Sequence, residues 1–205
     1  GLNPQFVWLM VVFVSGIGFG AYILVKLFGT RAGIGLSGVL GGLISSTATT
    51  VAMSRKSLRN RDVSTVASLA IVIACLAMFP RMILEILVVY PTLVDRVLVP
   101  VMVMIVLGLI PALYLGWITA TESPPEVEQD NPFRLKPALV FGVIFAAVLL
   151  LSRYSLEFYG ESGILVTAAI SGLADVDAIT LSVGRLMQTN QLAPETAARA
   201  VIIGA

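Results

Sequence analysis

Long runs of uncharged apolar residues recur along this 205-residue chain, and each run is long enough to cross a lipid bilayer as a helix. Hydrophobic residues make up 58% of the chain and charged residues only 12%, whereas soluble domains carry about 25% charged residues. Burying this much apolar surface in water would require a larger core than the chain can enclose. The sequence therefore predicts an all-α fold, a polytopic transmembrane helical bundle.

Seven membrane spans are predicted from these runs. They cover residues 6–28, 33–53, 63–90, 94–118, 137–159, 163–184 and 194–205. The segment TESPPEVEQDNPFRLK interrupts the apolar pattern, so residues 119–136 are predicted to form a hydrophilic linker.

Basic residues predict the orientation, because Lys and Arg in short loops favour the cytoplasmic side. The loop SRKSLRNRD after the second predicted span carries four of them and should be cytoplasmic. If every span crosses the membrane, Arg185 also lies on the inner side and Arg153 near the outer side.

The chain contains an internal similarity. A shift of 130 positions lays GGLISSTATTVAMSR over SGLADVDAITLSVGR, so that Gly42 meets Gly172. We therefore expect two three-span repeats: the first, with a connector span, occupies residues 1–118, and the second occupies residues 137–205. The repeats are parallel if every span crosses, and inverted if their second helices are broken or re-entrant.

Two aspartates interrupt the sixth predicted span, in the segment ADVDAIT. An ionised carboxylate inside a bilayer costs at least about 2.5 kcal/mol, so such residues persist mainly where they face a cavity, a partner or an ion. The repeat places the hydroxyls of SSTATT opposite these carboxylates. Together they predict an all-oxygen site for a hard cation, Mg²⁺, Ca²⁺ or Na⁺. The predicted ion-binding residues are Asp175, Asp177, Ser45, Ser46, Thr47, Thr49, Thr50 and Thr180, with the two aspartates as the metal ligands.

Other interpretations of these residues stay open. Serine and threonine in a membrane helix also bond the carbonyl four residues back and let helices approach closely. Arg81 and Glu85 have the spacing of an intrahelical ion pair and are predicted to be structural. The chain has no histidine and one cysteine, and no catalytic signature is present, so we expect no enzyme activity. We expect no cofactor other than a bound cation, and no nucleic-acid partner.

The segments GLSGVLGGLISSTATTVAMSRKS and SGLADVDAITLSVGRL resemble the C-terminal membrane domain of unknown function of bacterial MgtC/SapB-family inner-membrane proteins. The resemblance covers essentially the whole chain. It implies a multi-pass protein of the bacterial inner (plasma) membrane, with an N-terminal MgtC-like domain preceding this segment in the parent protein. A shorter, motif-level similarity links the Ser-Ser-Thr-Ala stretch to bacterial monovalent-cation/proton antiporters.

Two functions from different classes follow. The first is a membrane transport domain, a cation transporter or channel that uses the SSTATT and ADVDAIT segments. The alternative is a non-transporting membrane scaffold or regulatory module of an MgtC-like protein. In either case the partners are the lipid bilayer and a second copy of the chain, because small residues offer flat faces for a homodimer.

Overall fold

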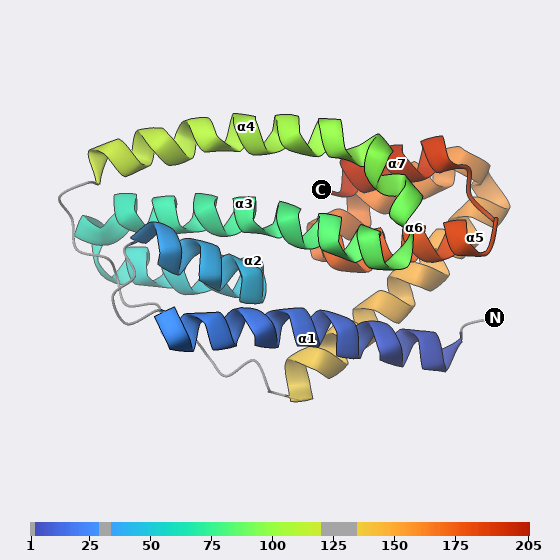
Figure 1. Ribbon diagram of the computed structural model, residues 1–205, viewed down its shortest axis with the longest axis horizontal. Coiled ribbons are helices and arrows are strands. Elements are labelled where there is room, and N and C mark those ends of the chain that lie inside the picture. Colours follow the sequence, from blue (N-terminus) through green and yellow to red (C-terminus); the bar gives the residue numbers. More distant parts are fainter. Residues whose placement is uncertain (1–2, 29–33, 120–134) are drawn as a thin grey trace. The chain divides into compact units, whose positions relative to one another are not determined.

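Helices account for nearly all of the computed structural model, which describes residues 3–28, 34–119 and 135–205. No strand occurs in these ranges, so the all-helical prediction is confirmed there. The helices are α1 (Pro4–Phe28), α2 (Ile34–Arg59), α3 (Ser64–Val89), α4 (Val94–Ile118), α5 (Leu135–Ala174), α6 (Val176–Gln188) and α7 (Pro194–Gly204), with 3₁₀ turns at Arg61–Val63 and Pro91–Leu93 (Figure 1).

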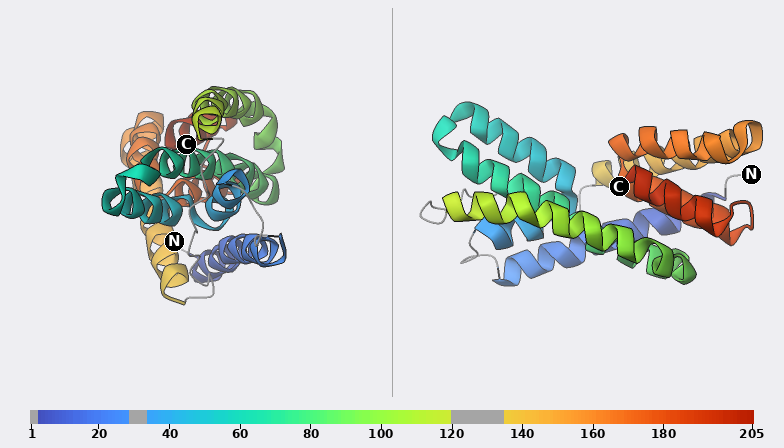
Figure 2. Two further views of the ribbon diagram at one scale, coloured as in Figure 1. Left: turned by 90° about the vertical axis from the view of Figure 1, so that its left-hand side faces the viewer. Right: turned by 90° about the horizontal axis from the view of Figure 1, so that it is seen from above.

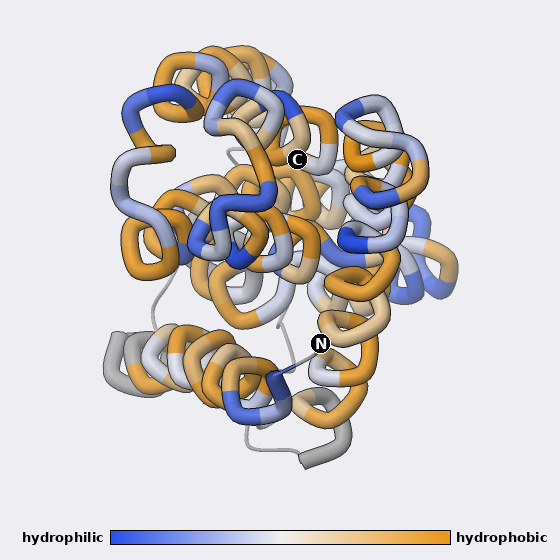
Figure 3. Tube along the Cα trace, turned by 90° about the vertical axis from the view of Figure 1, so that its right-hand side faces the viewer, coloured by the Kyte–Doolittle hydropathy of each residue, from blue (hydrophilic) through white to orange (hydrophobic). Residues whose placement is uncertain are grey.

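Four segments of the described chain are long and apolar enough to cross a membrane. They are Pro4–Ile23, Ser64–Val89, Pro91–Ile118 and Ala138–Ala174. In Figure 3 most of the tube is coloured hydrophobic, and hydrophilic stretches lie at several turns. Helices α6 and α7 have only 13 and 11 residues, fewer than the roughly 20 that a crossing needs. The seven-span count therefore stays a prediction, and most of the predicted linker lies outside the described residues.

Two of the long helices are interrupted by non-helical backbone. In α5 the break is at Gly160, whose φ of 62° and ψ of −147° belong to a region that essentially only glycine occupies. The two halves of α5 run in different directions on either side of this residue (Figure 2). In α2 the break is at Ser45. The break at Gly160 falls between the predicted spans 137–159 and 163–184, whereas the break at Ser45 falls inside the predicted span 33–53, where the sequence is uncharged.

The described residues group into two compact units. Unit 1 comprises Gly1–Phe13, Met82–Met102 and Leu135–Ala205. Within it α5, α6 and α7 pack against one another. Helix α6 lies at the centre of this packing: every residue from Ala178 to Met187 is buried except Arg185. The segment ADVDAIT therefore contains the N-cap Asp175 and the first turns of α6, which enter the core of unit 1.

Unit 2 comprises Val14–Arg81 and Val103–Arg134. Both halves of α2 pack against α3. Gly38 of the first half faces the Ile73 side chain, and Met53 of the second half is buried in a cluster with Ala67 and Ala70. Small residues at these positions allow the two backbones to approach closely.

Candidate functional site

The break in α2 is organised around Ser45. Its φ of −167° and ψ of 108° are extended, so the helix stops and restarts at this residue. The Ser45 Oγ accepts a hydrogen bond of 3.1 Å from the backbone N–H of Ala48. A hydroxyl that accepts from the amide three residues on is the standard N-cap arrangement, so Ser45 starts the second half of α2.

The break between α5 and α6 is organised around Asp175. Its φ of −163° and ψ of 113° are also extended. The Asp175 Oδ1 accepts a hydrogen bond of 2.8 Å from the Ala178 N–H, and the Asp175 N–H donates to the Ser171 carbonyl. Asp177 lies in the first turn of α6, where a negative charge is favoured by the partial positive charge of the helix N-terminus.

A tight helix contact accompanies each break. A Cβ added to Gly42 would lie 2.5 Å from Ala74 Cα of α3, and one added to Gly172 would lie 2.7 Å from Gly204 Cα of α7. Neither position has room for a side chain. Residues 42 and 172 are 130 positions apart, and so are residues 74 and 204.

The chain reverses direction at Ser45. A Cβ at Gly41 would lie 2.8 Å from Thr49 Oγ1, although eight residues of straight helix advance by about 12 Å. The two halves of α2 therefore fold back on each other as a hairpin.

The predicted hydroxyl ligands differ in exposure. Thr47 is exposed, Ser45, Ser46 and Thr50 are half-buried, and Thr49 is buried. Thr180 is 2% exposed, and its Oγ1 has no hydrogen-bond partner among the described residues. An unsatisfied buried hydroxyl is costly, so Thr180 is the hydroxyl of this set with unused capacity to bind a ligand.

The carboxylates and the SSTATT hydroxyls belong to different units, and each unit is described by itself. The combined site therefore stays a prediction. Within the described residues no group of three or more cysteine or acidic side chains is arranged to hold a metal ion. A cation bound at Asp175 and Asp177 would need hydroxyl, carbonyl or water oxygens as its remaining ligands.

Sequence reasoning predicted a structural role for Arg81 but not its contact with α2. Its side chain is 8% exposed, and Nη1 donates to the Ile44 carbonyl at 3.5 Å. Ile44 is the last residue before the Ser45 break, where a helix C-terminus carries a partial negative charge. The spacing to Glu85 indicated only a structural pair. The one sequence signal for a further role was the presence of a cation inside an apolar run.

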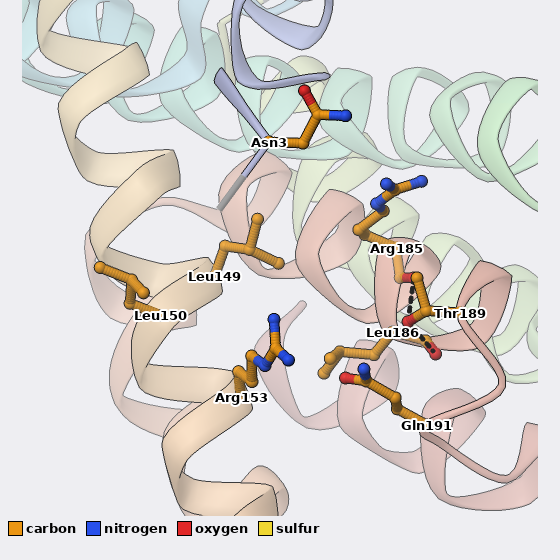
Figure 4. Close-up of a pocket in the computed structure, with 8 residues that line it drawn as sticks. All are labelled: Asn3, Leu149, Leu150, Arg153, Arg185, Leu186, Thr189 and Gln191. Carbon is orange, nitrogen blue, oxygen red and sulfur yellow. Dashed lines mark hydrogen bonds between the residues drawn. The ribbon is translucent and has the colours of Figure 1, made fainter. Parts of the chain in front are cut away.

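Arg153 and Arg185 line the same small cavity in unit 1 (Figure 4). The prediction that they lie on opposite sides of the membrane was made on the condition that every span crosses, and that condition stays a prediction. The chain breaks at Asp175 within residues 163–184, and α6 then brings Arg185 to the cavity that Arg153 also lines.

Comparisons with known proteins agree with the prediction of a domain of unknown function, and nothing in them ties the chain to MgtC/SapB proteins. The chain is similar to an uncharacterized protein of Aquifex aeolicus (strain VF5), with 30% identity over 170 residues, which is 82% of this chain and 74% of the relative. No solved structure matches the present chain. The model of the family described as "Domain of unknown function (DUF4010)" matches residues 12–205, and the chain belongs to this family.

Proposed function

We propose that this chain is a membrane transport domain for a cation, built from two inverted three-helix repeats. One repeat consists of α1, α2 and α3, and the other of the first half of α5, its second half with α6, and α7. Helix α4 connects them. The observation that carries the proposal is the pair of side-chain-capped helix breaks at Ser45 and Asp175.

Three features support the repeat. The backbone angles at Ser45 and Asp175 agree within 5°. Each of the two side chains caps the amide of the alanine three residues later. Each break is preceded, three residues earlier, by a glycine in backbone contact with the third helix of its repeat. All three coincide with the 130-residue shift in the sequence, which unrelated helix pairs would have no reason to follow.

The inverted arrangement is supported by contacts within unit 1. Phe6 of α1 lies 6.1 Å from Phe145 of α5 between ring centroids, and Val11 faces Gly142. Residue numbers increase along α1 from Phe6 to Val11 while those of the contacted residues decrease along α5 from Phe145 to Gly142. These repeat-related helices are therefore antiparallel. If each second element is a hairpin that does not cross the membrane, an odd number of crossings separates the repeats, which inverts them.

Broken helices suit ion transport, because they place backbone groups and polar side chains inside the membrane region where a continuous helix would offer none. We assign the cation to Asp175 and Asp177, with the Thr180 hydroxyl of the same unit as a further oxygen ligand. The break at Ser45 already holds a cationic group, the Arg81 guanidinium, at its carbonyl end. A second cation binds less readily there, so the carboxylates carry the charge selectivity.

Ion flux into proteoliposomes tests the transport proposal. The double variant Asp175→Asn, Asp177→Asn removes both charges, and Asn retains the ability to cap α6. We expect it to lose uptake of Mg²⁺ or Na⁺ while remaining folded. Asp95→Asn is the matched control, because Asp95 also lies in the first turn of a helix and is exposed. Equal flux in the double variant and wild type would remove the aspartates from the mechanism. No flux in any protein, including wild type, would favour the scaffold alternative.

Cysteine labelling tests the inverted topology separately. In a Cys75→Ala background, single cysteines at Glu161 and Gln191 should react with a membrane-impermeant maleimide from the same side. A cysteine at Arg59, in the basic loop, should react from the opposite side. All three native residues are exposed. Labelling of Glu161→Cys and Gln191→Cys from opposite sides would show that residues 163–184 cross the membrane, and would refute the hairpin.

A further inference from the structure

Unit 1 contains a cavity of about 70 Å³ between the start of α1, the first half of α5 and the end of α6. Asn3 comes from the residue before α1, Arg153 from the first half of α5, and Arg185 from the last turn of α6. In Figure 4 the Arg153 and Gln191 side chains extend toward each other from facing segments. The complete lining is Asn3, Leu149, Leu150, Arg153, Arg185, Leu186, Thr189 and Gln191.

The lining of the cavity combines cationic and neutral polar groups. Two of its lining residues are arginines, three are neutral and polar, and none is acidic. Each guanidinium carries five N–H donors in a planar fork that matches the oxygens of a phosphate group.

Arg185 is held in place by neighbours that leave most of its donors available. Its guanidinium carbon lies 4.3 Å from the centroid of the Phe6 ring. Its Nη1 donates to Gln188 Oε1 at 3.0 Å, and Gln188 Nε2 in turn donates to the Val89 carbonyl at 2.7 Å. A preorganised arginine loses less conformational entropy when it binds an anion.

The cavity lies beside the start of α1 and the end of α6. Asn3 directly precedes α1, and Thr189 and Gln191 belong to the turn that follows α6. Leu149, Leu150 and Leu186 supply an apolar wall beside the cationic groups. A cationic pocket with an apolar side, at the end of membrane helices, matches the boundary between the head group and the acyl chains of an anionic phospholipid.

We propose that this cavity is a binding site for a phosphate group, which either an anionic phospholipid or free inorganic phosphate supplies. Arg153 and Arg185 bind the phosphate oxygens, and Asn3 and Gln191 contribute neutral hydrogen bonds. The site uses none of the residues assigned to the cation, so its binding tests are separate from the test of cation transport.

Native mass spectrometry and thermal unfolding of the detergent-solubilised protein test the site. The probes are phosphatidylglycerol, phosphatidylcholine as a zwitterionic phosphate ester, and inorganic phosphate compared with chloride at equal ionic strength. We expect phosphatidylglycerol or inorganic phosphate to bind and to raise the unfolding temperature. Phosphatidylglycerol alone identifies a lipid site, and inorganic phosphate alone identifies a site for the free anion.

Variants locate the binding. Arg153→Gln and Arg185→Gln should each weaken it about tenfold, because each removes charge-assisted hydrogen bonds. Arg185→Lys keeps the positive charge but loses the guanidinium that lies over the Phe6 ring. Binding that persists in this variant is due to the charge and not to the contact with Phe6. Arg199→Gln is the matched control, because Arg199 is exposed on α7 and does not line the cavity. The proposal is overturned if neither probe binds wild type, or if Arg199→Gln weakens binding as much as the two cavity variants do.

Discussion

Ser45 and Asp175 adopt the same extended backbone conformation and make the same hydrogen bond, each accepting from the amide of the alanine three residues later. One is a neutral hydroxyl and the other a carboxylate. Both residue types are preferred helix N-caps, because each offers an oxygen that accepts from an otherwise unpaired amide. The geometry of the break is therefore shared, and the difference between the two positions is the charge.

Removing either cap should destabilise the helix that it starts. We expect Asp175→Ala to lower the free energy of unfolding by about 1 kcal/mol, because the Ala178 N–H loses its acceptor. Asp175→Ser should keep most of this stability, since serine makes the same cap at position 45. Thermal unfolding in mild detergent measures both. If the Ser and Ala variants are equally unstable, the cap is not what Asp175 contributes.

The glycines at the tight helix contacts should tolerate no side chain. Gly172→Ala places a Cβ against the backbone of Gly204, and we expect it to cost about 1–3 kcal/mol. Gly42→Ala should cost a similar amount against Ala74. Gly116→Ala is the control, because no described atom lies within 4 Å of its added Cβ and alanine favours helix. A control variant that loses as much stability as Gly172→Ala would count against the close-contact explanation.

Arg81 should stabilise the end of the first half of α2. Arg81→Met removes the hydrogen bond to the Ile44 carbonyl, and we expect a loss of about 1.5–3 kcal/mol. The loss should be local, so amide exchange at Ala48 and its neighbours should accelerate. Arg55→Met, at an exposed position of α2, serves as the control. Unchanged exchange in Arg81→Met would mean that the arginine does not hold the break.

The expected homodimer now has a candidate face. Gly16 and Gly20 of α1 are exposed, and no described atom lies within 4 Å of a Cβ at either. Four residues apart, they have the spacing at which two helices approach closely. Native mass spectrometry from mild detergent should show two copies, and Gly16→Leu with Gly20→Leu should convert them to monomers. Wild-type protein that is only monomeric would contradict the dimer.

Apolar runs were sufficient to predict helices, because a segment of roughly 20 apolar residues has few other ways to satisfy its backbone groups. The comparison of GGLISSTATTVAMSR with SGLADVDAITLSVGR paired Ser45 with Asp175. The structure breaks at these same two residues. The aspartates attracted notice for a simple energetic reason, the cost of desolvating a carboxylate.

What the tertiary structure decided was where the chain turns and which distant groups meet. Serine occurs inside membrane helices as well as at N-caps, so sequence alone left Ser45 undecided until the extended backbone and the Ala48 hydrogen bond fixed its role. Arg81 and Ile44 are 37 positions apart, and Arg153 and Arg185 are 32 apart. Local periodicity carries no information about such pairs, because their proximity follows from how α2 and α6 fold back and pack on their neighbours.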